Sequence, residues 1–100
     1  MTLEDVARYA ESLPGVKRKG TESRPAWYLH DRLVVRVQDH DTLVIRVPSS
    51  KRESLLERYP DSFGVPPRME AHHKLEAYLD HAPAHAVCEA IDLAWEMQRR

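Results

Sequence analysis

The sequence is poor in cysteine, glycine and long apolar runs, and each shortage excludes a class of protein. Its single cysteine, Cys88, cannot form an internal disulfide, so we expect a reduced, cytoplasmic setting. The three glycines, Gly15, Gly20 and Gly64, stand apart, which excludes a glycine-rich phosphate loop. No apolar run approaches the roughly 20 residues that span a bilayer, and the first ten residues lack the apolar segment of a signal peptide. We therefore expect no membrane partner.

Catalytic and metal-binding patterns are also missing. No Gly-x-Ser-x-Gly elbow occurs. The six histidines include two close groups, Asp39-His40-Asp41 and His72-His73, but neither has the spacing of a zinc site. Cys88 lies beside the apolar stripe of a predicted helix, where a free cysteine usually packs as a small apolar side chain, although His85 offers a base three residues away. We expect no enzyme, no catalytic residue, no metal and no cofactor.

Charge is balanced overall but unevenly distributed along the chain. The formal net charge is −1, so the whole domain lacks the strongly basic character typical of nucleic-acid-binding proteins. Residues 17–58 nevertheless hold ten Lys or Arg against six acids, while the segments before and after carry net charges of −2 and −3. Any electrostatic attraction to phosphate is therefore expected in the central segment.

Apolar periodicity and turn residues predict three helices. Thr2 with Asp5 and Ser50 with Glu53 have the spacing of capping boxes at helix starts. A Pro-Gly pair, Pro14-Gly15, ends the first helix. The predicted helices cover residues 3–13, 50–59 and 84–100.

Five strands are predicted. Apolar and polar residues alternate clearly over residues 32–37, 42–47 and 73–79, and shorter β-like runs cover residues 26–30 and 63–65. Leu33, Val35 and Val37 form the apolar face of the second strand, and Leu43, Ile45 and Val47 that of the third. If both faces point into the core, Val37 lies opposite Leu43. The loop between them then has an odd number of residues, most simply Asp39-His40-Asp41. The same parity places Trp27 on the core face if residues 30–32 form a three-residue turn.

The chain order is therefore helix, three strands, helix, two strands, helix, in a single domain over residues 1–100. Short alternating strands favour an antiparallel sheet with one buried face, and the three amphipathic helices would cover that face. We predict an α+β two-layer sandwich of order α-β-β-β-α-β-β-α.

Two short motifs resemble the MmcQ/YjbR family of small bacterial proteins. They are Leu13-Pro14-Gly15-Val16 after the first helix and Pro25-Ala26-Trp27 at the start of a strand. The following strands and capped helix come in the family's order, and the resemblance is clearest over residues 2–60. It implies a two-layer α/β fold similar to that of secretion chaperones. Through the family's usual label it also implies DNA binding by a winged surface.

The chain departs from this family pattern in its last third. Family members usually carry an aromatic- and glycine-rich stretch before the final strand, where this chain has Pro67-Arg68-Met69-Glu70-Ala71-His72-His73. If that stretch belongs to a binding surface, the surface differs here.

The central cations are candidates for weak DNA binding, since phosphate contacts need several Lys or Arg on one surface. Tyr28 and Tyr78, on the outward side of their strands, could stack on bases. The other interpretation is a solvated face without a ligand, because Lys and Arg are mostly exposed in any protein. The candidate phosphate contacts are Arg18, Lys19, Arg24, Arg36, Arg46, Lys51 and Arg52.

A second hypothesis gives the outward face of the sheet a different role. A face that mixes valine, tyrosine and arginine resembles the centre of a protein interface, so the protein would form a homodimer or bind another protein without nucleic acid. The candidate interface residues are Tyr28, Val34, Val44 and Tyr78.

Overall fold

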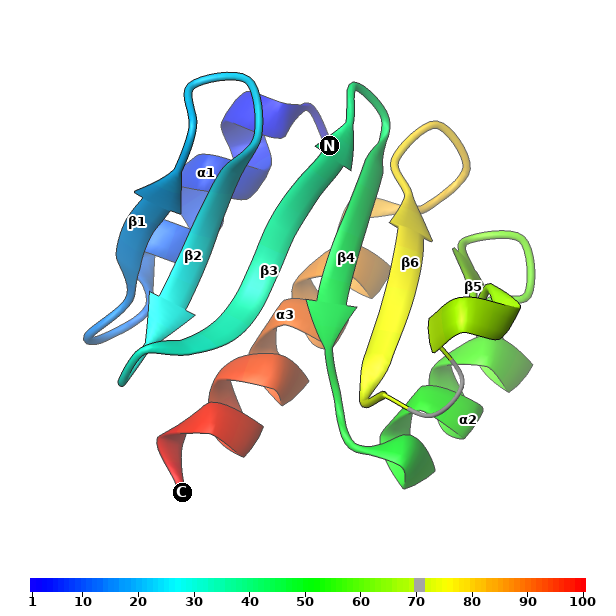
Figure 1. The fold of residues 1–100 in the computed structure, drawn as a ribbon. Helices are drawn as coiled ribbons and strands as arrows, with labels where there is room; N and C mark the ends of the chain where they lie inside the picture. The colour runs from blue at the N-terminus through cyan, green and yellow to red at the C-terminus, as the bar shows by residue number, and fades with distance from the viewer. Residues whose placement is uncertain (70–71) are drawn as a thin grey trace.

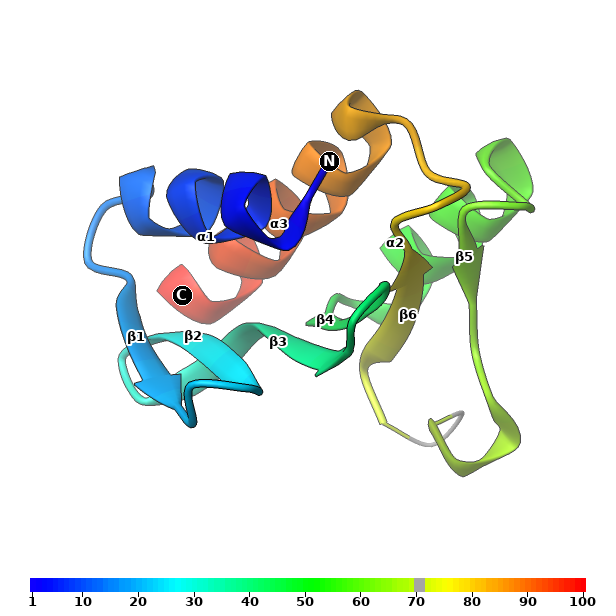
Figure 2. The same cartoon turned by 90° about the horizontal axis from the view of Figure 1, so that it is seen from above.

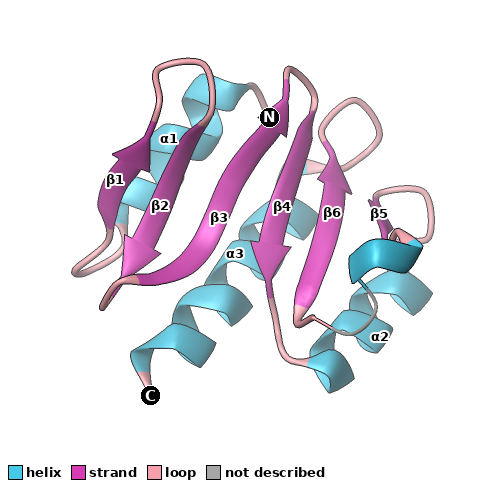
Figure 3. Ribbon diagram, viewed as in Figure 1, coloured by secondary structure: helices cyan, strands magenta, loops and turns pink. Residues whose placement is uncertain are grey.

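Three α-helices cover one face of a six-stranded sheet, and the other face is open except beside β5 and β6, where a short helical turn lies on that side (Figures 1 and 2). The computed structural model describes residues 1–69 and 72–100. Within them the helices are α1 (Leu3–Ser12), α2 (Ser49–Arg58) and α3 (Ala84–Arg99), with a short 3₁₀ turn, η1 (Pro67–Met69). The strands are β1 (Lys17–Gly20), β2 (Pro25–Leu29), β3 (Arg32–Asp39), β4 (Thr42–Arg46), β5 (Phe63–Gly64) and β6 (Lys74–Tyr78) (Figure 3).

The strands lie in the order β1-β2-β3-β4-β6-β5, and neighbouring strands are antiparallel. α3 packs across β2, β3 and β4, while α2 contacts β5. The predicted α+β class and two-layer arrangement are confirmed, and the predicted order of elements holds apart from one additional strand, β1.

The two central hairpins have the predicted register but shorter loops. Val37 lies opposite Leu43, as expected. The loops contain only two residues each, His40-Asp41 and His30-Asp31, and a register shift in each hairpin supplies the extra residue. The three-residue turns expected from the sequence are therefore wrong, because a β-bulge restores the alternation as well as an odd-length loop does.

The turn between β2 and β3 is tight without containing glycine. His30 and Asp31 both have positive φ, 52° and 62°. Two consecutive residues of this kind are typical of a type I′ turn, whose twist matches that of the flanking strands. Asp and His adopt positive φ more readily than most residues. The turn places Trp27 and Leu29 in the core, where Trp27 is fully buried, as the alternation predicted.

β1 is an edge strand that the sequence pattern did not predict. Its four residues are all exposed, so they show no apolar alternation. Gly20 is needed at its end, because φ is +86° and a Cβ would lie 2.5 Å from the carbonyl oxygen of Arg24. The lysines of β1 also oppose pairing of this edge with another chain.

The two predicted capping boxes have different outcomes. At α1, Asp5 N–H donates to Thr2 Oγ1 at 3.1 Å and Thr2 N–H donates to the Asp5 carboxylate at 2.9 Å, which confirms the first. The capping box of Ser50 with Glu53 is wrong, because α2 already begins at Ser49 and has no side-chain cap. Pro48, with φ of −61°, starts this helix one residue earlier than predicted.

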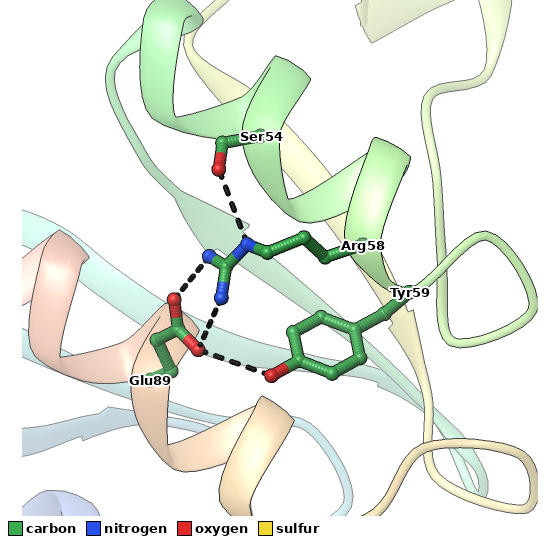
Figure 4. Close-up of polar contacts among 4 residues, drawn as sticks. All are labelled: Ser54, Arg58, Tyr59 and Glu89. Carbon is green, nitrogen blue, oxygen red and sulfur yellow. Dashed lines mark hydrogen bonds and ion pairs between the residues drawn. The ribbon is translucent and has the colours of Figure 1, made fainter.

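An ion pair between Arg58 and Glu89 joins α2 to α3 (Figure 4). The guanidinium donates to both carboxylate oxygens, Nη1 to Oε1 at 3.1 Å. Ser54 accepts from Arg58 Nε at 3.2 Å, and the Tyr59 hydroxyl donates to Glu89 at 3.4 Å. The Arg58 hydrogen bonds hold the pKa of Glu89 below its ordinary value, which fixes the carboxylate as an acceptor between the helices.

Candidate nucleic-acid interface

A row of directly paired residues crosses the open face of the sheet. Lys19 lies opposite Ala26, and Ala26 opposite Arg36. Arg36 in turn lies opposite Val44, and Val44 opposite Glu76. Residues that lie opposite one another share a face, and this face looks toward the viewer in Figure 1, away from the helices. Alternation along the strands adds Lys17, Tyr28, Arg46, Lys74 and Tyr78 to the same face.

Three cations gather on this face without carboxylate partners. Arg46 lies directly opposite Lys74, and Arg36 is diagonal to Arg46 on the next strand. Burial, and then the nearby charges of Arg36 and Arg46, lower the pKa of Lys74. None of them forms an ion pair within residues 1–69 and 72–100. We call Arg36, Arg46 and Lys74 the cationic triad.

Two acids on or beside the open face, Glu76 and Asp31, are already engaged by other cations. Glu76 is almost buried and lies 3.5 Å from Arg68. The Tyr78 hydroxyl donates to Glu76 at 3.2 Å, and burial followed by this carboxylate raises the pKa of Tyr78. Asp31, at the β2–β3 turn, accepts from Lys19 at 2.7 Å. Neither of these acids therefore forms an ion pair with the cationic triad.

The valines proposed for a protein interface are not available on the surface. Val34 and Val44 are fully buried, and Val34 belongs to the core cluster. Val44 does lie on the open face, where the long stems of neighbouring Arg36 and Arg46 can cover it. No large hydrophobic side chain is exposed in the described part of the chain. Tyr28 and Tyr78, the other two interface candidates, are half-buried on this face.

The structure brings only part of the predicted phosphate-binding set together. Arg36, Arg46 and Lys19 lie on the open face as predicted, although Lys19 is paired with Asp31. Arg24 is exposed in the loop between β1 and β2. These four cations lie on, or at the margin of, the sheet surface.

The remaining predicted contacts lie elsewhere. Arg18 is on the helix side of β1, where Nε donates to Glu11 at 2.5 Å and the guanidinium stacks 5.4 Å from the centre of the Trp27 ring. Lys51 is on α2, beside the end of α3. Arg52 is buried and bonded to backbone carbonyls. Arg18 therefore faces the helices rather than the open face, and Lys51 and Arg52 belong to α2 rather than to the sheet.

The predicted set of phosphate contacts omits two cations of the open face, Lys17 and Lys74. Lys17 lies opposite Tyr28 on the unpredicted strand β1. Lys74 precedes Glu76 and Tyr78 in β6, so the same alternation that placed those residues outward would have placed Lys74 there. A hollow of about 220 Å³, lined by Lys74, Arg46, His72 and His73, lies at this end of the face.

Two other candidate clusters are explained by local structure. The ligand atoms of Asp39, His40 and Asp41 lie within 4.8 Å of one another. Hydrogen bonds from Asp41 lower the pKa of Asp39, as expected in a tight turn of this kind. Burial raises the pKa of the Cys88 thiol, and its Sγ lies 4.0 Å from the Met1 sulfur. A raised pKa disfavours the reactive thiolate.

Comparison with known proteins supports the fold. No protein-family model matches the chain, and no curated protein matches it in sequence. The crystal structure of Deinococcus radiodurans protein DR2400, a DUF419 domain, superposes with a TM-score of 0.75 at 20% identity. The match covers 96% of this chain and 77% of that one. The chain therefore has a small α/β fold similar to that of DR2400. No helix in the described residues is long and apolar enough to cross a membrane.

Proposed function

We propose that this protein binds DNA through the open face of its sheet, as a non-enzymatic, cytoplasmic protein of the MmcQ/YjbR type. The observation that supports the proposal is the cationic triad of Arg36, Arg46 and Lys74, which no carboxylate of the described residues neutralises. A polyanion would supply the missing charge along the whole face.

The chemistry of the face fits the nucleic-acid backbone better than an apolar partner. Lys17 and the triad present four cations on one surface that form no ion pair within the described residues, and each contact to phosphate releases condensed counterions. The half-buried rings of Tyr28 and Tyr78 lie on the same side and offer contact to sugars or unstacked bases. The buried valines and the lack of exposed large apolar side chains in the described residues do not favour an apolar protein interface.

The proposal is tested by titrating the protein against a short fluorescent duplex at several salt concentrations. Four phosphate contacts predict a log–log slope of affinity against salt near −3.6. Phosphatidylserine vesicles and a single strand of the same length are titrated in parallel, because other polyanions could also bind a basic face. No duplex binding at low salt, or binding to the vesicles alone, would show that the proposed function is wrong.

A further inference from the structure

One end of the open face is shaped into a small basic hollow. Its volume is about 220 Å³, and its lining residues are Arg46, His72, His73 and Lys74. Arg46 is the last residue of β4, and Lys74 is the first of β6 directly opposite it. Two cations and two imidazoles therefore meet in one concave place, and none of the described lining residues is a carboxylate.

The backbone beneath this hollow is held from inside the protein. Arg52 on α2 is almost fully buried. Its Nη1 donates to the carbonyl oxygens of Met69 at 3.4 Å, His72 at 2.8 Å and Lys74 at 3.2 Å. The N–H of Val47 donates to the His73 carbonyl at 3.0 Å. These bonds fix the main chain before any ligand arrives, and preorganised charges bind an anion without an ordering cost.

The start of α2 adds positive potential nearby. Ser49, its first residue, follows Arg46 by three positions and lies with Oγ 3.2 Å from His73 Nδ1. The first turn of the helix contains no acidic residue. The positive end of the helix dipole is therefore not neutralised by its own side chains.

We propose that the hollow of Arg46, His72, His73 and Lys74 is a binding subsite for a single phosphate group. This inference rests on the proposed DNA binding of the open face and specifies where one backbone phosphate is held. Lys74 and Arg46 supply charge-assisted hydrogen bonds from the two facing strands, and the imidazoles add ring N–H donors. Lys17 and Arg36, two further cations of the face, contact the polyanion elsewhere.

Inorganic phosphate is the probe for this subsite. Backbone amide NMR spectra are recorded during a phosphate titration, with sodium chloride added to keep ionic strength constant. We expect saturable shifts confined to residue 46 and residues 72–74. Lys74→Gln and Arg46→Gln should each weaken binding about tenfold, since each removes a charge-assisted hydrogen bond. Lys51→Gln, which removes an exposed cation on α2, should leave the affinity unchanged.

The outcomes separate this inference from the proposed function. Shifts that do not saturate, or that spread over the surface lysines, would indicate an adventitious ion only and overturn the subsite. If the duplex binds and Arg36→Gln weakens it while phosphate leaves residues 46 and 72–74 unperturbed, the subsite is wrong and DNA binding stands. If phosphate saturates the hollow but no duplex binds, the subsite stands and the proposed function is wrong.

Discussion

Arg46 on β4 lies directly opposite Lys74 on β6, so two cations occupy facing positions of one sheet. Like charges in such a pair destabilise the folded state. Burial, together with Arg36 and Arg46, lowers the pKa of Lys74, which expresses the same repulsion. A pair that served stability alone would combine opposite charges, as Lys19 and Asp31 do at the other side of the sheet. The facing cations therefore suit a surface that meets an anion.

Replacing Lys74 should separate stability from binding. Lys74→Gln removes the like-charge pair, and we expect the free energy of unfolding to rise by about 0.5 kcal/mol. Duplex affinity should fall in the same variant because a phosphate contact is lost. Urea denaturation and fluorescence anisotropy measure the two effects. A variant that is both less stable and equally active in binding would contradict this account of Lys74.

Arg52 should matter for folding rather than for direct phosphate contact. Arg52→Ala removes the donor shared by three carbonyls in the interior, so we expect a loss of about 3 kcal/mol in unfolding free energy. Arg24→Ala, in an exposed loop, is the matched control and should change stability by less than about 0.5 kcal/mol. Equal stabilities of the two variants in urea would argue against the structural role of Arg52.

Asp31 should restrain DNA binding by pairing with Lys19. Asp31→Asn removes the carboxylate that Lys19 contacts at 2.7 Å, while asparagine tolerates the positive φ of this position. We expect tighter duplex binding and a salt slope steeper by about 0.9, as one more phosphate is neutralised. Asp61→Asn makes the same change of net charge at an exposed site between α2 and β5 and serves as the control. Identical slopes for the two variants would rule out a specific effect of the Lys19 pair.

Acid should destabilise the protein because protonation weakens the hydrogen bonds that the Glu11 and Glu89 carboxylates accept. Hydrogen bonds from Trp27 and Arg18 lower the pKa of Glu11, and those from Arg58 lower the pKa of Glu89. A carboxylate whose pKa is lower in the folded than in the unfolded protein stabilises the fold at any pH above its unfolded pKa, about 4.3 for glutamate. This stabilisation is lost as the pH falls through the folded pKa, because the carboxylate then takes up a proton. Urea unfolding measured from pH 6 down to about pH 3 should therefore show falling stability.

The carboxylate responsible is identified by substitution. Glu11→Gln should flatten part of this decline because the residue no longer takes up a proton. Glu53→Gln, at an exposed position on α2, should keep the slope of the unmodified protein. A Glu11→Gln protein with an unchanged pH slope would mean that the bonds to Trp27 and Arg18 add no acid-sensitive stability.

The alternation of apolar and polar residues predicted most of the strands and the face on which most of their side chains lie. It places Val37 opposite Leu43 and puts Arg36 and Arg46 on the outward face, because side chains in a strand alternate whatever the loop does. It failed at β1, where exposed Lys-Arg-Lys-Gly leaves no apolar signal. It also misjudged the loops and the start of β3, because a bulge adds one residue to a strand. Val34 joins the core cluster there, while Leu33 lies opposite Tyr28 of the open face.

The candidate site was only partly predictable for a different reason. Arg18, Lys51 and Arg52 were grouped with the cations of the sheet because all of them lie in the basic central segment of the sequence. Their environments depend on contacts distant in sequence, namely the Glu11 carboxylate for Arg18 and the carbonyls of His72 and Lys74 for Arg52. Such partners are defined only once the strands and helices have packed together.

Two matched triple variants test the central claim most directly. The first replaces Arg36, Arg46 and Lys74 by glutamine on the open face, and the second replaces Arg8, Lys51 and Arg99 by glutamine on the helices. Both lose three positive charges. We predict that the sheet variant binds duplex much more weakly and that the magnitude of its salt slope is smaller by about 2.7, while the helix variant binds as the unmodified protein does. Equal loss of binding in both variants would contradict a DNA-binding sheet face.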